Sequence, residues 1–206
     1  MKVLSIIAIA GLASAATANP LYSNNEASQL PQTGTLASGQ FDLNLDNVAS
    51  WDASGSSNNV VMLVDLNAAL GGVAGSFASM TGIGWDVTIS TVGASWLSET
   101  TAYFDDNIAP DGMGLFLSPG AGDDLPGTAS YSSGGIIDLS DNGIADIALA
   151  DGILRIEFQE SFDDITGDID SFINGTFTIV ADYTVPAPAG LAVLGLGGLV
   201  AARRRR

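Results

Sequence analysis

Alternation of apolar and polar residues is the dominant pattern in the middle of the chain. Apolar side chains at every second position predict strands with one buried face. Four runs show this pattern, over residues 41–45, 85–89, 154–158 and 177–183. A continuous apolar run over residues 60–66 predicts a central strand that is covered on both faces.

Turn-forming clusters of Gly, Asn, Asp and Ser separate these runs. They occupy residues 54–59, 111–112, 119–124, 132–135, 141–143 and 151–152. This spacing predicts an all-β fold, an antiparallel β-sandwich or jelly-roll-like domain. Asp151 and Gly152 predict a two-residue hairpin between strands over 144–150 and 153–160. Glycines within residues 67–80 favour a short turn or coil there over a stable helix.

The N-terminal segment has the order of parts found in secretory signal peptides. Lys2 precedes a short apolar run, and small residues with an Ala-x-Ala pattern follow at 16–18, with 13–15 as the alternative cleavage site. This order predicts a helical signal peptide over residues 1–18 and a mature protein that begins near Asn19. Residues 19–39 lack an apolar period and predict a flexible leader before the β domain, which we place at 40–184.

The C-terminal segment combines a proline motif, an apolar run and a cationic end. The motif is Val185, Pro186, Ala187 and Pro188, and the chain ends in Arg203, Arg204, Arg205 and Arg206. Each arginine would cost about 2.5–3.5 kcal/mol at the centre of a membrane helix, and cationic flanks mark the cytoplasmic side. The tail therefore predicts a short transmembrane helix that stops at the arginines and leaves the domain outside. Its apolar run is shorter than the roughly 20 residues that cross a bilayer comfortably.

Residues 185–206 resemble the PEP-CTERM sorting signal of exported Gram-negative proteins. The resemblance implies recognition by an exosortase, a membrane-embedded cysteine protease that cuts near the proline motif and passes the protein to the cell surface or extracellular matrix. The usual Pro-Glu-Pro of that family is Pro186-Ala187-Pro188 in this chain. The alternative is a simple C-terminal anchor that is never cut.

The charge of the domain changes the expected partners. The chain has 23 acidic and 6 basic residues, and five of the basic ones lie in the two terminal segments. Arg155 is the remaining one, so the exported body carries 1 minus 23, or a net charge of −22. This balance argues against nucleic acid as a partner and against anionic lipid surfaces, because phosphate contacts need basic side chains. It favours solubility, cation uptake or life in high salt.

Missing residue types exclude most catalytic chemistry. The chain has no His and no Cys, which removes the Ser-His-Asp triad, thiolate nucleophiles and the usual zinc ligands. With Lys2 in the signal peptide, Schiff-base chemistry is removed as well. We therefore expect a non-catalytic protein. A glycan hydrolase is the least favoured alternative: it would use paired carboxylates, with Glu157 and Glu160 as acid candidates, but Arg155 is a ready partner for Glu157.

Aromatic and acidic residues gather in segments 95–100 and 103–106, as in a sugar-binding face. Aromatic rings stack on sugars while carboxylates accept from their hydroxyls, so a carbohydrate-binding module for exopolysaccharide is a second hypothesis. Packing of Trp51, Trp85 and Trp96 into the core is the favoured interpretation, because each lies in or beside an apolar strand.

One acidic segment is a candidate calcium site. It contains Asp163, Asp164, Asp168 and Asp170, with Gly167 to allow a tight turn. Ca²⁺ prefers about six to eight oxygen ligands, which an acidic loop outside the cytoplasm can supply. The alternative is a solvated acidic loop.

Overall fold

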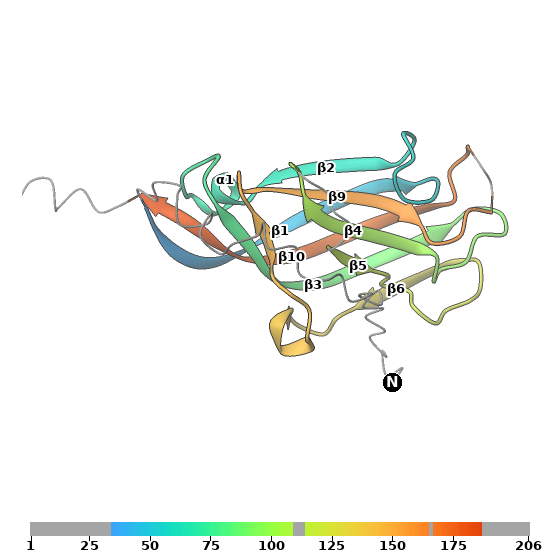
Figure 1. Ribbon diagram of the computed structural model, residues 1–206. Coiled ribbons are helices and arrows are strands. Elements are labelled where there is room, and N and C mark those ends of the chain that lie inside the picture. The colour runs from blue at the N-terminus through green and yellow to red at the C-terminus, as the bar shows by residue number, and fades with distance from the viewer. Residues whose placement is uncertain (1–33, 109–113, 165–166, 187–206) are drawn as a thin grey trace, which may run out of the picture.

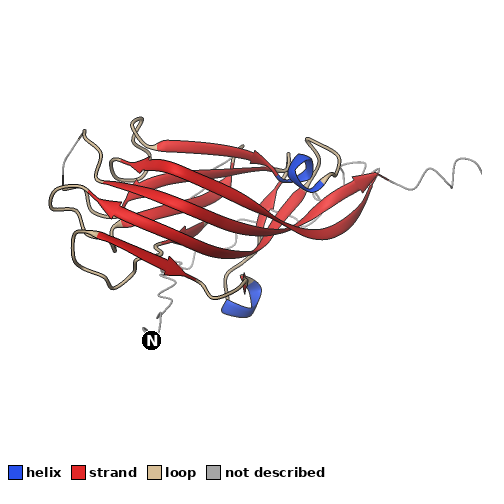
Figure 2. Ribbon diagram, turned by 180° about the vertical axis from the view of Figure 1, so that it is seen from behind, coloured by secondary structure: helices blue, strands red, loops and turns tan. Residues whose placement is uncertain are grey.

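A computed structural model describes residues 34–108, 114–164 and 167–186, and these form two antiparallel β-sheets packed face to face (Figures 1 and 2). The expected all-β class is confirmed. The predicted signal peptide and the predicted tail beyond Pro186 lie outside the described residues. Within the described ranges, no helix has the length and apolar character needed to cross a membrane.

The strands of the described residues fall into short and long elements. They are β1 (Gly34–Ser50), β2 (Val60–Asp65), β3 (Ala78–Thr91), β4 (Thr100–Asp106), β5 (Leu115–Leu117), β6 (Thr128–Ser132), β7 (Ile137–Asp138), β8 (Ile147–Leu149), β9 (Ile153–Glu160) and β10 (Ser171–Pro186). Two single-turn helices accompany them, α1 (Leu66–Leu70) and the 3₁₀ turn η1 (Ser140–Asn142).

The two sheets are built from strands that are distant in sequence. The larger sheet has the order β1-β10-β3-β6, with β7 and β8 also paired to β3, and the smaller has the order β2-β9-β4-β5. Every pairing is antiparallel. The first strand thus pairs with the last, the second with the second-last, and the innermost pair is β4 with β5. The last residues of β1 and β9 and the first residues of β4 and β10 consequently lie at the same end of the sandwich.

Apolar side chains from both sheets form one core. The alternating runs of β3, β9 and β10 place Trp85, Leu154 and Phe177 inside, as predicted. Phe177 of the larger sheet stacks against Phe158 of the smaller sheet at 6.3 Å between ring centroids. It also tilts against Phe104 at 5.6 Å. These aromatic contacts join the faces of the two sheets.

Strand β2 is an edge strand, so the prediction of a central strand at 60–66 is wrong. It pairs only with β9 at the end of the smaller sheet. Its inward residues are half-buried, whereas Val61 is 42% and Leu63 is 57% exposed. Apolar side chains on both faces of a strand predict cover on both faces, but the outer face of β2 meets solvent.

The predicted hairpin at Asp151 and Gly152 is also wrong. The strand before it, β8, pairs with β3, whereas the strand after it, β9, pairs with β2 and β4 in the other sheet. Gly152 has φ +74°, which suits both a hairpin turn and a turn that carries the chain from one sheet to the other. The chain crosses between the sheets here, because Leu149 and Leu154 are both fully buried and enter the core from opposite sheets.

Both ends of the domain extend further than the predicted range of 40–184. Strand β1 begins at Gly34, inside the predicted flexible leader, and residues 34–39 pair with 181–186 of β10. Val185 and Pro186 of the proline motif are the last residues of β10. The turn expected within 67–80 is α1, which Asp65 caps at its start and Gly71, at φ 77°, ends.

The aromatic contact between the sheets gives a test of the packing. Phe177→Ala should destabilise the fold by about 3–5 kcal/mol, because it opens a cavity between Phe104 and Phe158. Phe162→Ala is the control and should change stability by less than about 0.5 kcal/mol, since Phe162 is 63% exposed. Urea unfolding measures both. Equal effects of the two substitutions would contradict this packing.

Candidate functional site

The core ends in a layer of buried polar residues, the polar end layer. Ser50 ends β1 opposite Ser171 of β10, and Thr100 begins β4 opposite Glu160 of β9. All four are at most 1% exposed. Each continues the inward-facing alternation of its strand, so a polar side chain stands where the pattern would place an apolar one.

A chain of hydrogen bonds crosses this layer from one sheet to the other. The Thr100 hydroxyl donates to Ser171 Oγ at 2.8 Å, and the Ser171 hydroxyl donates to Glu160 Oε1 at 2.7 Å. Glu160 Oε2 is buried and meets no donor with hydrogen-bonding geometry among the described residues. The nearby Ser50 hydroxyl is likewise left without a partner of acceptable geometry. Only half of the Glu160 carboxylate is therefore satisfied.

Asp170 is held against the same layer by its backbone and by one side-chain oxygen. Its N–H donates to the Ser50 carbonyl at 3.0 Å, and its carbonyl accepts from the Val92 N–H at 2.7 Å. Its Oδ1 accepts from the Ser95 hydroxyl at 2.9 Å, while Oδ2 is buried without a partner. Asp163 Oδ1 is a third buried carboxylate oxygen without a donor.

Glu99 approaches the cluster from the start of β4. Its Oε2 accepts from the Trp96 N–H at 2.7 Å, and its carbonyl accepts from the Ser161 N–H at 2.8 Å. We call five residues the carboxylate cluster: Glu99, Glu160, Asp163, Asp164 and Asp170. They come from the start of β4, the end of β9 and the connection between β9 and β10.

Burial and mutual repulsion raise the pKa values of Glu160, Asp170 and Glu99. Burial raises the pKa of Glu160 to about 7, and the negative charges of Asp170 and Glu99 add to the shift. Burial also raises the pKa of Asp170, with Asp163 and Asp164 contributing. The pKa of Glu99 is raised by burial and by the adjacent Asp164 carboxyl. Each shift shows that the charged form is poorly compensated.

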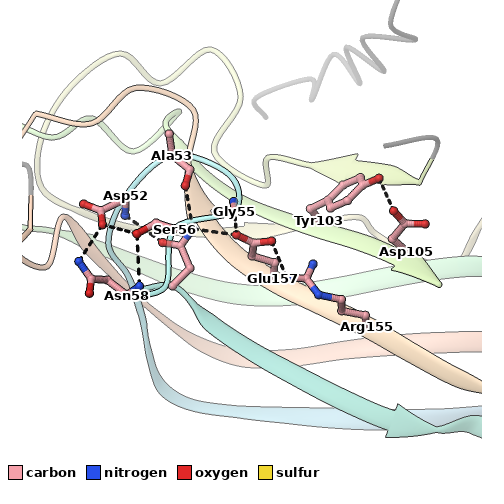
Figure 3. A network of polar contacts seen from close by, with 10 residues as sticks. Asp52, Ala53, Gly55, Ser56, Asn58, Tyr103, Asp105, Arg155 and Glu157 are labelled. Carbon is pink, nitrogen blue, oxygen red and sulfur yellow. Dashed lines mark hydrogen bonds and ion pairs between the residues drawn. The ribbon is translucent and has the colours of Figure 1, made fainter. Parts of the chain in front are cut away.

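No basic side chain among the described residues neutralises the cluster. Arg155 is the one basic residue in the described part of the chain, and it donates to Glu157 Oε2 at 2.7 Å (Figure 3). Glu157 is satisfied further by Asn59 and by the Gly55 N–H, at 2.9 and 2.7 Å. Although burial opposes them, these hydrogen bonds lower the pKa of Glu157. The expected Arg155–Glu157 pairing is confirmed.

Asp52 lies near the cluster but is fully satisfied. Its Oδ2 accepts from Ser56 and Asn58, at 2.6 and 2.9 Å (Figure 3). Its Oδ1 accepts from the Gly167 N–H at 3.0 Å. The Ser56 hydroxyl and the Gly167 amide lower the pKa of Asp52. Asp52 thus anchors the segment before Asp170, and both of its oxygens already accept hydrogen bonds.

The structure changes the set of residues predicted for a calcium site. Asp163, Asp164 and Asp170 come together, but Asp168 is exposed and its Oδ1 accepts from the neighbouring Ile169 N–H at 2.8 Å. Sequence reasoning left Glu99 and Glu160 out of the site. Glu160 carried a signal, because it follows Leu154, Ile156 and Phe158 at the inward-facing spacing. In the described ranges, no group of three or more acidic side chains already stands at metal-ligating spacing.

The aromatic residues of the sugar-binding hypothesis are separated in the structure. Trp85 is 5% exposed in the core, as favoured, and Trp51 is half-buried. Trp96 is 43% exposed beside Glu99, so core packing is wrong for this residue. Tyr103 is 4% exposed, stacks on Phe116 at 4.1 Å and donates to Asp105 at 2.6 Å (Figure 3).

Comparisons with known proteins give distant matches to solved structures alone. No family model and no curated protein matches the chain. A structure of Desmodium yellow mottle tymovirus is similar at 12% identity and a TM-score of 0.28, over 75% of this chain and 90% of that one. The coat protein of Tobacco streak virus is similar at 14% identity and a TM-score of 0.26, over 78% and 92%. Similarity this low indicates nothing about what the chain does.

The raised pKa of Glu160 predicts that stability falls as pH rises. Between pH 4.5 and about 7, folded Glu160 keeps a proton that the unfolded chain has lost, so stability is lost across this window and is level above it. A shift of this size corresponds to on the order of 3 kcal/mol at full burial.

Glu160→Gln should reduce this pH dependence and make the protein more stable than the wild type at pH 8. Chemical unfolding in the presence of a chelator, at pH 5 and pH 8, measures the effect. Asp168→Asn, at an exposed position, is the control and should retain the wild-type slope. An unchanged slope in Glu160→Gln would show that Glu160 ionises normally in the fold.

Proposed function

We propose that this protein is an exported, non-catalytic component of the cell surface or extracellular matrix, delivered by an exosortase-type protease that reads its C-terminal tail. The observation that carries the proposal is the order of parts along the chain: a signal segment, an acidic β domain, and a proline motif followed by an apolar run and four arginines. The route is export across the inner membrane, transient anchoring by the tail, and release to the surface.

The end of β10 supports this order. Val185 and Pro186 pair with Thr35 and Gly34 at the end of the ladder, so the strand finishes inside the proline motif. A cut after Pro186 would remove no residue of the sheet. The domain would keep its fold after processing, as a surface protein released from its anchor must.

Burial of the best acid candidate supports a non-catalytic role. Glu160 has a raised pKa that a general acid would need, but it is 1% exposed. A glycan could not contact its carboxyl without opening the end of the sandwich. Glu157, the other candidate, is held in the hydrogen bonds that lower its pKa.

The finer fold assignment is part of the proposal. The nested pairing of β1 with β10, β2 with β9 and β4 with β5 is the pattern of a single long hairpin rolled into two sheets, which supports a jelly roll. A signal helix over residues 1–18 and a short transmembrane helix in the tail complete the proposed organisation.

Binding of exopolysaccharide is the second candidate function. Trp96 favours it, because its side chain is 43% exposed and its backbone N–H donates to Glu99 of the carboxylate cluster. An exposed indole stacks on sugar rings, and neighbouring carboxylates accept from hydroxyls. In this case the protein would act by binding the matrix rather than only by residing in it.

The sorting proposal predicts the fate of tail variants. Deleting residues 185–206 should release a soluble domain, since the anchor is lost. Replacing Pro186 and Pro188 by Ala should leave an uncut, membrane-bound precursor, because the protease motif is lost and the anchor kept. Pro126→Ala, in an exposed loop, is the control and should be processed normally. Immunoblots of membrane and soluble fractions measure the outcome. Normal processing of the double variant would leave a plain anchor.

The carbohydrate proposal predicts that Trp96→Ala loses binding to the polysaccharide of the producing cells. The expected loss is about 1–3 kcal/mol, or roughly five- to 150-fold in affinity, typical of removing an aromatic anchor. Affinity electrophoresis measures it, with Phe162→Ala as an exposed aromatic control. Equal mobility of wild type and both variants, with and without polysaccharide, would remove this candidate.

A further inference from the structure

Three buried carboxylate oxygens of the carboxylate cluster have no hydrogen-bond donor among the described residues: Glu160 Oε2, Asp163 Oδ1 and Asp170 Oδ2. Buried polar atoms are nearly always satisfied, and charged ones most of all. The other oxygens of Glu160 and Asp170 accept from Ser171 and Ser95, which fixes the direction of both carboxylates. The unsatisfied oxygens belong to residues whose charges repel one another.

Nothing in the described part of the chain can satisfy these oxygens together. The hydroxyls of Thr100, Ser171 and Ser95 already donate elsewhere. The Ser50 hydroxyl interacts with Glu160 and lowers its pKa, but it has a single proton and can satisfy one oxygen at most. Arg155 is bonded to Glu157. A proton on one carboxyl would satisfy a single oxygen and leave the others. A cation among the carboxylates would satisfy all of them and remove the repulsion at the same time.

We propose that the carboxylate cluster is a calcium site, with Glu160 and Asp170 as its buried ligands and Asp163, Asp164 and Glu99 closing it from the surface. Hard oxygen ligands exclude the soft metals, and zinc sites use His and Cys, which the chain lacks. Mg²⁺ demands near-ideal octahedral geometry, whereas Ca²⁺ accepts an irregular set of carboxylates, hydroxyls and water. The proposal does not depend on how the protein is sorted.

The site has a fixed half and a movable half. Glu160 and Asp170 are 1% and 0% exposed and are oriented by serine hydroxyls. Asp163 is half-buried and Asp164 is exposed, so these two side chains have more room to rotate toward the fixed pair than Glu160 and Asp170 have. This rotation is needed, since no three carboxylates in the described residues stand at ligating spacing. Asp168 lies outside the site and is bonded to its own loop.

Thermal unfolding of the full-length chain in detergent tests the site. After treatment with a chelator, the protein is compared in CaCl₂ and in NaCl of equal ionic strength, which separates binding from screening. Extracellular calcium modules bind at about 0.1–1 mM. At about ten times the dissociation constant, Ca²⁺ should raise Tm by roughly 3–6 °C over NaCl. Equal Tm values in the two salts would overturn the proposal.

Matched variants locate the site. Glu160→Gln and Asp170→Asn keep the shape of each side chain, and each should abolish the extra rise in Tm. Asp168→Asn removes the same charge from the same loop and should keep the full rise. The proposal is overturned if Glu160→Gln and Asp170→Asn respond as the wild type does, or if Asp168→Asn alone loses the response.

Terbium luminescence gives a readout that does not depend on the stability of the variants. Tb³⁺ seeks the same oxygen ligands, and Trp96, whose backbone N–H donates to Glu99, is the nearby indole that can sensitise it. Emission should appear with the wild type, fall when excess CaCl₂ is added, and be lost in Trp96→Phe. Emission that CaCl₂ cannot displace, or that persists unchanged in Asp170→Asn, would contradict binding at this cluster.

Discussion

At one end of its core the protein buries negative charge that no basic side chain in the described ranges neutralises. Arg155 is committed to Glu157, so the carboxylates around Glu160 and Asp170 depend on hydroxyls and amides alone. Hydrogen bonds of this kind satisfy some oxygens and leave others open. The polar end layer, the raised pKa of Glu160 and the proposed calcium site all follow from this one imbalance.

The nested order of the strands is what creates the imbalance. Pairing of the first strand with the last brings Ser50 beside Ser171, and pairing of β4 with β9 brings Thr100 beside Glu160. The connection from β9 to β10 must then pass over this end and carries Asp163, Asp164 and Asp170 with it. The acidic segment, which looks like a surface loop in the sequence, is thereby joined to the interior of the sandwich.

Local patterns predicted the strands, and long-range pairing decided what the sequence alone left open. Alternation at Trp85, Leu154 and Phe177 correctly marked the faces that form the core. The turn at Asp151 and Gly152 was misassigned because its residues suit both a hairpin and a crossing between sheets. The edge position of β2 was missed for a similar reason, since an apolar run does not show whether a second neighbour exists.

Local sequence patterns likewise predicted only part of the carboxylate cluster. Asp163, Asp164 and Asp170 were identified from their density in the sequence, whereas Glu99 joins them from a segment far away. Glu160 was detectable in principle, because an inward-facing glutamate at the end of a buried strand needs an explanation. Asp168 could not be separated from its neighbours, since its bond to the Ile169 N–H depends on the shape of the loop.

A crystal structure of the domain grown in calcium, with anomalous diffraction measured, tests the central claim most directly. The account predicts an anomalous peak between the carboxylates of Glu160 and Asp170, with Asp163 or Asp164 turned toward it. An ordered water or empty density at that point, with Asp163 and Asp164 pointing into solvent, would contradict the claim that a cation balances the buried charge.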